Sequence, residues 1–504
     1  MKALLSFHKL GNDSWVELPN LLRAHGVETC LTVRGQDDPE NKFEVTFDSL
    51  PNFTVPDFWS ALPISLDGVR EYRKFEGSEF FPRISSQLNT MQNRRDFTGT
   101  FRQLERELRI RRILLVTFTA VLRQAPDFAA FDVTPHDHVN AAIEAVLRWL
   151  DIPIIFFQPS LVGPQSLPRT SLTEEFGYRI HPGIRDSFSA ELEEVVGLAN
   201  AAIFRLDGGA GTPKMSSQFD REKTAYSLGG RFRGALFFIR RLGKGLHFPS
   251  VNFSGHTFLP APFRRLVELV LDWSLRRSLV DSIRKLSSAG PGSSESFALF
   301  ALHYEPERCS IPEGFPFSSQ FDAVVAARAL LPEHVHLFVK EHFSQSASAL
   351  RGTLGRSPEY YTVLGDIPGV TVLGIEAKTR EIILNAQCVF TLTGKVGIEA
   401  ALLGTPVLVG GQPWWKGMPG TGTLSEILTD SDYSEFVALA MPARTEVFDW
   451  LDEKFRDSLV PVLGDATLDR YESRISKLPA RYGDLQLAVL LDVLRSFIST
   501  ISRD

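Results

Sequence analysis

Short apolar runs alternate with amphipathic stretches over most of this 504-residue chain. Near the N-terminus, Lys2 to Phe7 reads as a strand, Trp15 to His25 as a helix and Val27 to Val33 as a second strand. This order is a βαβ opening. Further along, Arg102 to Arg112 reads as a charged helix, and Ile113 to Thr117 reads as a buried strand. The first half of the chain therefore predicts an α/β domain.

A second alternating series follows a stretch at 287–296 that is rich in Ser, Gly and Pro and is typical of a linker. Strands that alternate with helices at this spacing predict a parallel, doubly wound sheet. The predicted strands are Phe297 to His303, His334 to Lys340, Val370 to Leu373, Cys388 to Thr391 and Val407 to Val409.

Four segments follow from this pattern. We expect an N-terminal domain with a helical insert at 1–286, the linker at 287–296, a ligand-binding domain at 297–430 and C-terminal helices at 431–504. The last helix, Leu485 to Ile501, is apolar on one face and is expected to pack back on the N-terminal domain.

Composition narrows the class of protein. The chain has 54 basic and 60 acidic side chains and a net charge of −6. This balance does not favour non-specific binding to nucleic acid. Three scattered cysteines, Cys30, Cys309 and Cys388, fit a reducing cytoplasm. No run is long enough to cross a bilayer. The Arg-rich helix at Phe263 to Leu286 reads as core-facing, with peripheral contact at the inner face of the membrane as the alternative.

The stretch from Cys388 to Gly404 reads as a strand, a tight turn and a helix. Gly394 lacks a Cβ, so a ligand can approach the backbone closely there. Free N–H groups at the helix start, together with the helix dipole, favour a phosphate, and Glu399 lies where it could reach a ribose hydroxyl. The alternative is an ordinary α/β turn after Thr393, with Glu399 as a solvated helix residue.

Other polar residues follow neighbouring strands of the same predicted sheet. His303 and Glu305 come after one strand, and Lys340 and His342 come at the end of the next. In open α/β sheets, the carboxyl ends of the strands meet at the ligand-binding edge. Lys340 and His342 suit a phosphate by charge and hydrogen bonding, although a surface lysine and a loop histidine fit the local pattern too.

The N-terminal half offers candidates for a general base. His136, Asp137 and His138 lie in a loop after a predicted strand, where Asp137, with His136, could deprotonate a sugar hydroxyl. Asp137 could instead cap the helix that follows. Asp13, after the first strand near His8, is the second candidate and is also a potential helix cap. Asp430-Ser431-Asp432 follows no strand, so we interpret it as a turn rather than a metal motif, and no metal or cofactor is predicted.

Five motifs in the second half resemble the capsule polysaccharide biosynthesis family, and Pro135-His136-Asp137 with Gln158-Pro159-Ser160-Leu161 is similar to its N-terminal half. The resemblance covers about Phe297 to Gly420 closely and about 113–170 loosely. The five motifs are His303-Tyr304-Glu305-Pro306-Glu307-Arg308, Val339-Lys340-Glu341-His342, Thr393-Gly394-Lys395-Val396-Gly397-Ile398-Glu399-Ala400, Gly404-Thr405-Pro406-Val407 and Gly411-Gln412-Pro413-Trp414-Trp415.

The resemblance implies a GT-B glycosyltransferase, with two Rossmann-like domains facing a central cleft, the nucleotide-sugar donor in the C-terminal domain and a glycan or glycolipid acceptor in the N-terminal one. Some members are Kdo transferases that use CMP-Kdo and contact it through Lys-x-His-Pro. Phe343 replaces that proline here, which leaves a CMP-Kdo-like and a UDP-hexose donor both open.

The sequence thus predicts a metal-independent glycosyltransferase in surface or capsular polysaccharide assembly. The alternatives are a nucleotide-sugar 2-epimerase of the same architecture and a non-catalytic polysaccharide assembly protein. The oligomeric state is not predicted. The expected donor-binding residues are His303, Glu305, Lys340, His342, Thr393, Gly394 and Glu399.

Overall fold

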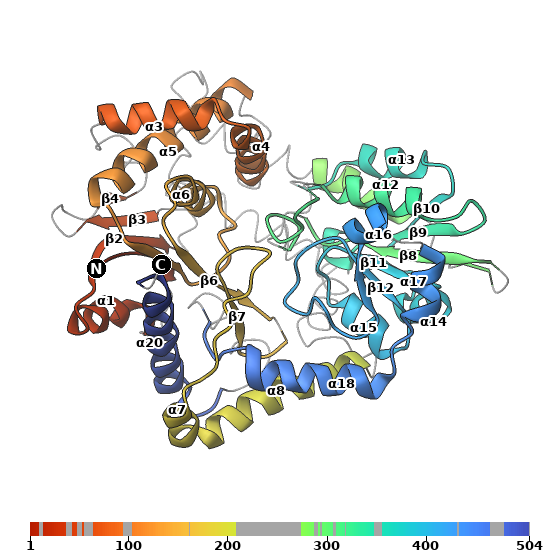
Figure 1. Cartoon of the computed structure of the whole chain (residues 1–504). Coiled ribbons are helices and arrows are strands. Elements are labelled where there is room, and N and C mark those ends of the chain that lie inside the picture. Colours follow the sequence, from red (N-terminus) through yellow and green to blue (C-terminus); the bar gives the residue numbers. More distant parts are fainter. Residues whose placement is uncertain are drawn as a thin grey trace, which may run out of the picture. The chain divides into compact units, whose positions relative to one another are not determined.

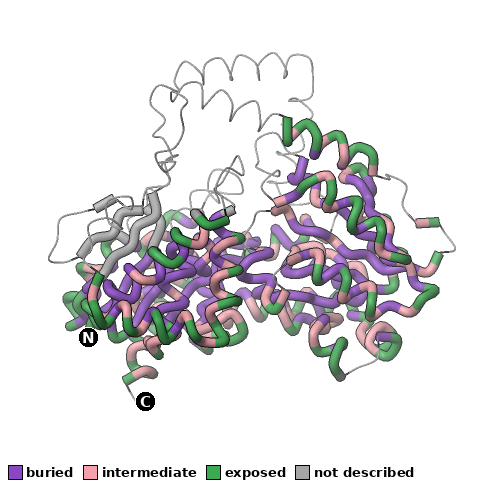
Figure 2. Tube along the Cα trace, turned by 90° about the horizontal axis from the view of Figure 1, so that it is seen from above, coloured by how far each residue is buried: buried purple, intermediate pink, exposed green. Residues whose placement is uncertain are grey.

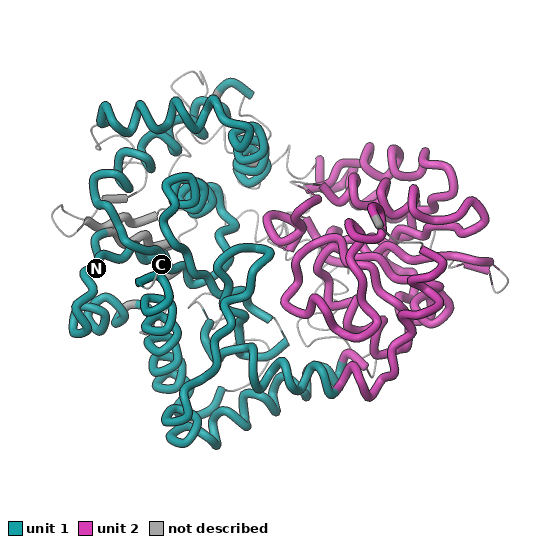
Figure 3. The backbone as a smooth tube through the Cα atoms, viewed as in Figure 1, with its two compact units in different colours: residues 1–92, 102–205, 449–504 teal, residues 93–101, 206–448 magenta. Residues whose placement is uncertain are grey.

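A computed structural model shows two α/β units (Figure 1). It describes residues 1–9, 14–36, 43–47, 53–54, 64–93, 103–160, 162–207, 274–286, 291–292, 295–305, 309–317, 319–346, 355–430, 433–463 and 478–502. Unit 1 comprises residues within 1–92, 102–205 and 449–504, and unit 2 comprises residues within 93–101 and 206–448 (Figure 3). The chain therefore changes unit at 92/93, 101/102, 205/206 and 448/449. The predicted linker at 287–296 lies within the range of unit 2.

The sheet of unit 1 has seven strands in the order β4-β3-β2-β1-β5-β6-β7. The central strands β2, β1, β5 and β6 are parallel, and β3, β4 and β7 pair antiparallel at the two edges. The strand bounds are β1 Lys2–Lys9, β2 Glu28–Gln36, β3 Phe43–Phe47, β4 Phe53–Thr54, β5 Phe128–Phe131, β6 Ile154–Pro159 and β7 Ser166–Arg169.

Alternate residues of these strands supply one core of unit 1. Ala3 and Leu5 of β1 share a buried cluster with Trp15 of α1 (Ser14–Ala24), because successive side chains of a strand point to opposite faces. The C-terminal helix α20 (Tyr482–Ile501) fills the same cluster with residues such as Leu490 and Phe497. The indole of Trp15 also donates to the carbonyl of Leu463 (3.2 Å). The C-terminal helix α20 therefore packs in the same core as β1 and α1.

The remaining helices of unit 1 lie on the opposite side of the sheet or beside α20 (Figure 1). Helix α5 packs on both α3 and α6, and α7 contacts α20. The helix bounds are α3 Leu66–Glu76, α4 Phe80–Asn93, α5 Gln103–Gln124, α6 His138–Trp149, α7 Pro182–Ser187 and α8 Ser189–Asp207.

Helix α5 corrects one prediction from the sequence. The run Ile113 to Thr117 is not a strand but the middle of this 22-residue helix. Ile113, Leu114, Val116 and Thr117 are all buried, since α5 is covered by two other helices. A helix that is buried on several sides loses the polar positions that reveal its 3.6-residue period, so a short apolar run in it resembles a strand.

Unit 2 contains a six-stranded sheet in the order β10-β9-β8-β11-β12-β13, and all its pairings are parallel. Numbered within the unit, this is the 3-2-1-4-5-6 order of Rossmann-type sheets. The bounds are β8 Phe297–Ala301, β9 His336–Lys340, β10 Val370–Leu373, β11 Val389–Thr391, β12 Val407–Val409 and β13 Thr421–Thr423.

Helices cover both sides of this sheet, with α12, α13 and α16 on one side and α14 and α15 on the other (Figure 1). Figure 2 shows that buried residues run through the strands of both units. The helix bounds in unit 2 are α12 Gln320–Leu330, η2 Phe343–Ser346, α13 Pro358–Gly365, α14 Thr379–Asn385, α15 Val396–Leu402, α16 Leu424–Asp430 and α17 Tyr433–Leu439. Helix α18 (Arg444–Glu453) crosses the boundary at 448/449, and η4 (Lys454–Ser458) belongs to unit 1.

These two sheets confirm the predicted α/β class with two Rossmann-like units. Of the predicted Arg-rich helix, residues 274–285 are described and helical, and Leu279 and Ile283 are buried in the core of unit 2. Its earlier part lies outside the described residues, as do Ser431 and Asp432 of the predicted turn.

Candidate functional site

The strand order of unit 2 reverses between β8 and β11, and the predicted donor residues gather at that point. His303 lies two residues after the end of β8, and Thr393 and Gly394 lie two and three residues after the end of β11. Lys340 ends β9, the strand on the other side of β8. All these strands present their carboxyl ends to the same edge of the sheet, where open α/β sheets bind ligands.

His303 joins the ends of β8 and β11. Its Nε2 accepts the backbone N–H of Thr393 (3.0 Å) and lies 3.3 Å from Oγ1 of Thr391. Burial, together with the nearby charge of Arg356, lowers the pKa of His303 to about 4. The imidazole is therefore neutral near pH 7, and because Nε2 accepts the Thr393 N–H, the ring proton is on Nδ1.

The turn at Gly394 does not present the free N–H groups of Thr393 and Gly394 that the sequence led us to expect. The N–H of Thr393 is bound by His303, and the N–H of Gly394 donates to Oγ1 of Thr391 (3.3 Å). A Cβ at position 394 would lie 2.8 Å from that oxygen and 3.2 Å from Cε1 of His303, so the turn requires glycine. These two N–H groups are thus used inside the protein, and another group has to supply the attraction for an anion.

Lys340 is such a group. Its side chain is buried, and its ammonium donates to the carbonyl of Glu341 (3.4 Å). Among the described residues, no carboxylate lies within ion-pair distance of the ammonium. Burial lowers the pKa of Lys340, while the charges of Glu341 and Glu376 oppose this shift. A buried ammonium without a salt-bridge partner is unfavourable, and an anionic ligand would relieve this cost.

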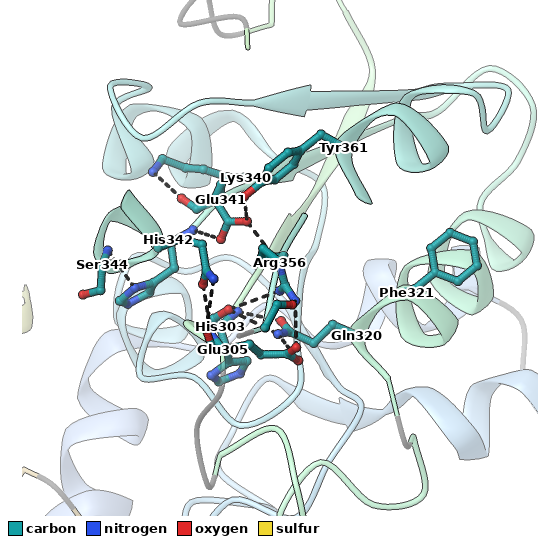
Figure 4. A network of polar contacts seen from close by, with 12 residues as sticks. His303, Glu305, Gln320, Phe321, Lys340, Glu341, His342, Ser344, Arg356 and Tyr361 are labelled. Carbon is teal, nitrogen blue, oxygen red and sulfur yellow. Dashed lines mark hydrogen bonds and ion pairs between the residues drawn. The ribbon is translucent and has the colours of Figure 1, made fainter. Parts of the chain in front are cut away.

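A polar network centred on Arg356 holds the ends of β8 and β9 (Figure 4). The guanidinium contacts Oε2 of Glu305 (2.8 Å) and Oε2 of Glu341 (3.4 Å), and it also donates to the carbonyl of His303 (3.4 Å). It lies over the ring of Tyr360, 4.1 Å from the centroid. Because Arg356 is buried, these contacts fix the backbone of both strand ends.

Two glutamines complete this frame. Gln320 accepts the backbone N–H of His303 (2.6 Å) and donates to Oε1 of Glu305 (2.6 Å). Gln345 accepts the N–H of Glu305 (2.9 Å) and donates to its carbonyl (2.9 Å). The segment that carries His303 is therefore bound on both sides by amide side chains. Sequence analysis did not identify Arg356, Gln320 or Gln345.

The segment after β9 is ordered by Glu341. Its Oε1 accepts the N–H of His342 (2.5 Å), and its Oε2 accepts from the hydroxyl of Tyr361 (2.9 Å). Burial raises the pKa of Glu341, and Arg356 opposes that shift. Nδ1 of His342 accepts the N–H of Ser344 (3.2 Å), which makes Nε2 the protonated nitrogen of a neutral ring. Phe343 is buried at the start of η2.

Glu399 belongs to the same unit but not to the Arg356 network. It lies in α15 and is half-buried, and burial raises its pKa while Arg380 opposes the shift. The unit thus brings His303, Thr393 and Gly394 into direct contact and connects Glu305 with Lys340 and His342 through Arg356 and Glu341. Glu399 stays a predicted donor contact.

The candidates for the base lie in unit 1. Asp137 is the N-cap of α6, and its Oδ1 accepts from the N–H groups of Val139 (2.9 Å) and Asn140 (3.1 Å). The carboxylate is largely buried. Nδ1 of His136 lies 2.9 Å from the carbonyl of Thr134. Asp13 lies outside the described residues. The capping role considered for Asp137 is therefore present, and its role as a base stays a prediction.

The described part of the chain contains no cluster of three or more His, Cys, Asp or Glu side chains placed to hold a metal ion. It also contains no helix with the length and apolar character required to span a membrane.

Comparison with known proteins gives matches among solved structures alone. No family model and no curated protein sequence matches the chain. The KpsC β-Kdo 2,4-transferase of Thermosulfurimonas dismutans is similar at 13% identity and a TM-score of 0.26, over 65% of this chain and 87% of that one.

Two other similar structures cover more of the chain. The UDP-GlcNAc 2-epimerase of Neisseria meningitidis has 10% identity and a TM-score of 0.18, over 98% of this chain and 100% of that one. The glycotransferase of kitacinnamycin has 14% identity and a TM-score of 0.21, over 94% of this chain and 99% of that one. These values are low, and the fold assignment rests on the sheet topology of the two units.

Proposed function

We propose that the chain is a glycosyltransferase of the GT-B type that binds a nucleotide-sugar donor at the carboxyl ends of β8, β9 and β11. The observation that carries the proposal is Lys340, a buried ammonium without a carboxylate partner among the described residues, at the edge where Rossmann-type sheets bind nucleotides. A nucleotide phosphate would supply the missing negative charge.

The reaction separates a sugar from a nucleotide phosphate, on which negative charge develops. Lys340 would stabilise this leaving group because its charge is already desolvated and held in place. His342, whose ring orientation is set by Ser344, would donate to a phosphate oxygen from Nε2. Arg356 is the positioning residue, since it is bound to Glu305 and Glu341 and keeps the two strand ends in register.

The acceptor would be a glycan or glycolipid of surface or capsular polysaccharide assembly, as the motif resemblance implies. Its hydroxyl would lose a proton to Asp137, with His136 beside it. A carboxylate that caps a helix is fixed in direction, so capping and proton abstraction are compatible roles for the same side chain.

Calorimetric titration with CMP, UDP and GDP tests the donor site. We expect saturable binding of one nucleotide to the wild type and at least about tenfold weaker binding to Lys340→Ala and His342→Ala, because each removes a charge-assisted or directed hydrogen bond. Lys378→Ala is the matched control, since Lys378 is an exposed lysine of the same unit. Equal affinity in Lys340→Ala and the control, or no binding of any of the three, would refute the assignment.

A further inference from the structure

A hollow whose lining includes charged and hydroxyl side chains lies wholly in unit 1. It has a volume of about 740 Å³, and its walls are the segment 177–185, Asp457 and one face of α20. Helices α7 and α20, which flank it, contact each other. The helix contributes Asp492, Arg495, Ser496 and Ser499, spaced so that they share one helical face. The volume is in the range of pockets that bind small molecules.

The carboxylates that line this hollow already bind other side chains of the protein. The hydroxyl of Tyr178 donates to Oδ2 of Asp492, and the guanidinium of Arg185 contacts Oδ1 of Asp457 (3.3 Å). Arg185 also donates to the carbonyl of Arg456 (3.1 Å), which ties the segment 177–185 to η4. Both carboxylates are therefore engaged within the walls, and the walls are cross-linked.

The donors of the hollow are not used in the same way. Arg495 donates to Nε2 of His25, and Nδ1 of that ring lies 2.8 Å from the carbonyl of Leu21. A ring nitrogen, unlike a carboxylate, holds Arg495 without cancelling its charge. Arg179 also lines the hollow. Within the described ranges, neither arginine has a carboxylate at ion-pair distance.

A third donor comes from His181. Its Nδ1 accepts the N–H of Gly183 (3.1 Å), so Nε2 is the protonated nitrogen of the neutral ring. The hollow thus combines an N–H donor of a histidine with two guanidinium groups that lack acidic partners. Planar guanidinium forks match carboxylate and phosphate groups, and Ser496 adds a hydroxyl beside them.

We propose that this hollow binds a small hydrophilic molecule through an oxyanion, a carboxylate or a phosphate, held between Arg179 and Arg495. The site is separate from the donor site, because every residue that lines it belongs to unit 1. It would give the chain a second anion-binding function in addition to nucleotide recognition.

The test is calorimetric titration of the full chain with two probes, inorganic phosphate and glucuronate, at low salt. We expect saturable binding of at least one probe, weakened roughly tenfold by Arg179→Ala and by Arg495→Ala. Arg123→Ala, an exposed arginine of the same unit, is the control for loss of one positive charge. Thermal melting of each variant establishes that it is folded.

Lys340→Ala separates this site from the donor site. Probe binding that persists in Lys340→Ala and is lost in Arg179→Ala and Arg495→Ala supports the hollow, and the probe that binds identifies the anion. Binding that is lost in Lys340→Ala but unchanged in the arginine variants overturns the proposal. Failure of both probes to bind the wild type also overturns it.

Discussion

At the scale of single residues, Lys340 is an ammonium group that folding removes from water without giving it a carboxylate partner among the described residues. Burial lowers its pKa, so it loses its proton at a lower pH than an exposed lysine does. The protonated form is the one that attracts a phosphate. A ligand phosphate in turn favours that form, which links nucleotide binding to protonation.

We therefore predict that nucleotide affinity falls as the pH rises through the lowered pKa of Lys340, below the usual range for lysine. The measurement is calorimetric titration at a series of pH values on the alkaline side. Lys340→Arg, which keeps its charge at any pH at which the protein is folded, should flatten this decline. An affinity that declines equally in both proteins would show that another group titrates.

His303 gives a second pH dependence, in which the stability of the fold decreases on the acid side. Its pKa is about 4 in the folded protein against 6.5 in an unfolded chain. Between these values the unfolded state binds the proton and the folded state does not, so stability should decrease as the pH falls from 6.5 towards 4. The full decrease is about 3 kcal/mol for such a shift.

His303→Gln tests this assignment. The glutamine oxygen can still accept the N–H of Thr393 but does not titrate in this range. We expect the acid-side loss of stability, measured by urea unfolding from pH 7 to pH 4, to be smaller in this variant than in the wild type. Parallel curves for the two proteins would contradict a neutral, buried His303.

Arg356 shows why some residues of the site could not be predicted from the sequence. It lies 51 positions from Glu305 and 15 from Glu341, and an isolated arginine usually indicates a solvated surface residue. Its importance depends on which loops the fold brings together. His303 and Lys340, in contrast, lie at the carboxyl ends of apolar strands, so the rule that these ends form the binding edge of a parallel sheet was enough to select them as candidates.

At the scale of elements, α6 poses the question of whether Asp137 is a helix cap, a base or both. Asn caps helices about as well as Asp, whereas Ala costs about 1 kcal/mol at this position. Asp137→Asn keeps the cap but weakens the bond that Nδ2 of Asn140 donates to Oδ2 of Asp137 (2.7 Å). We predict that this variant melts closer to the wild type than Asp137→Ala does and loses roughly 10²- to 10⁴-fold in kcat, the usual contribution of a general base. The measurement is release of the nucleotide product in the presence of acceptor, together with thermal melting.

Asp137→Ala is the control for the cap, because it should lower both stability and activity. If Asp137→Asn retains wild-type activity, Asp137 acts only as a cap and the base lies elsewhere. Both substitutions remove the carboxylate, but only Asp137→Ala also removes the helix cap. Comparing the two variants therefore separates the two roles of Asp137.

The elements of unit 2 were predicted better than those of unit 1, for a physical reason. Strands such as β9 and β11 are short and buried, and turn residues end them, so each is separated clearly from the next helix. In unit 1, α5 was partly taken for a strand because other helices cover it and hide its period. The antiparallel strands β3 and β4 lie in a stretch without a regular pattern, and the sequence did not reveal them.

At the scale of the whole molecule, the two ends of the chain form one core, while the proposed donor site lies in a different unit. Leu490 of α20 is fully buried in the cluster that contains Trp15 of α1. Replacing a buried leucine by alanine costs about 2–5 kcal/mol, since it removes apolar contacts and leaves a cavity. The residues proposed to bind the nucleotide all belong to unit 2.

We therefore predict that Leu490→Ala lowers the unfolding temperature but leaves the nucleotide affinity of the folded protein within about twofold of the wild type, whereas Lys340→Ala does the reverse. Thermal melting and calorimetric titration of both variants, at a temperature where each is folded, measure the two effects. Lys340→Ala should leave unit 1 intact because no side chain of that unit is changed. If Leu490→Ala abolishes nucleotide binding while the protein is still folded, the donor site depends on unit 1, and the assignment of the site to one unit is wrong.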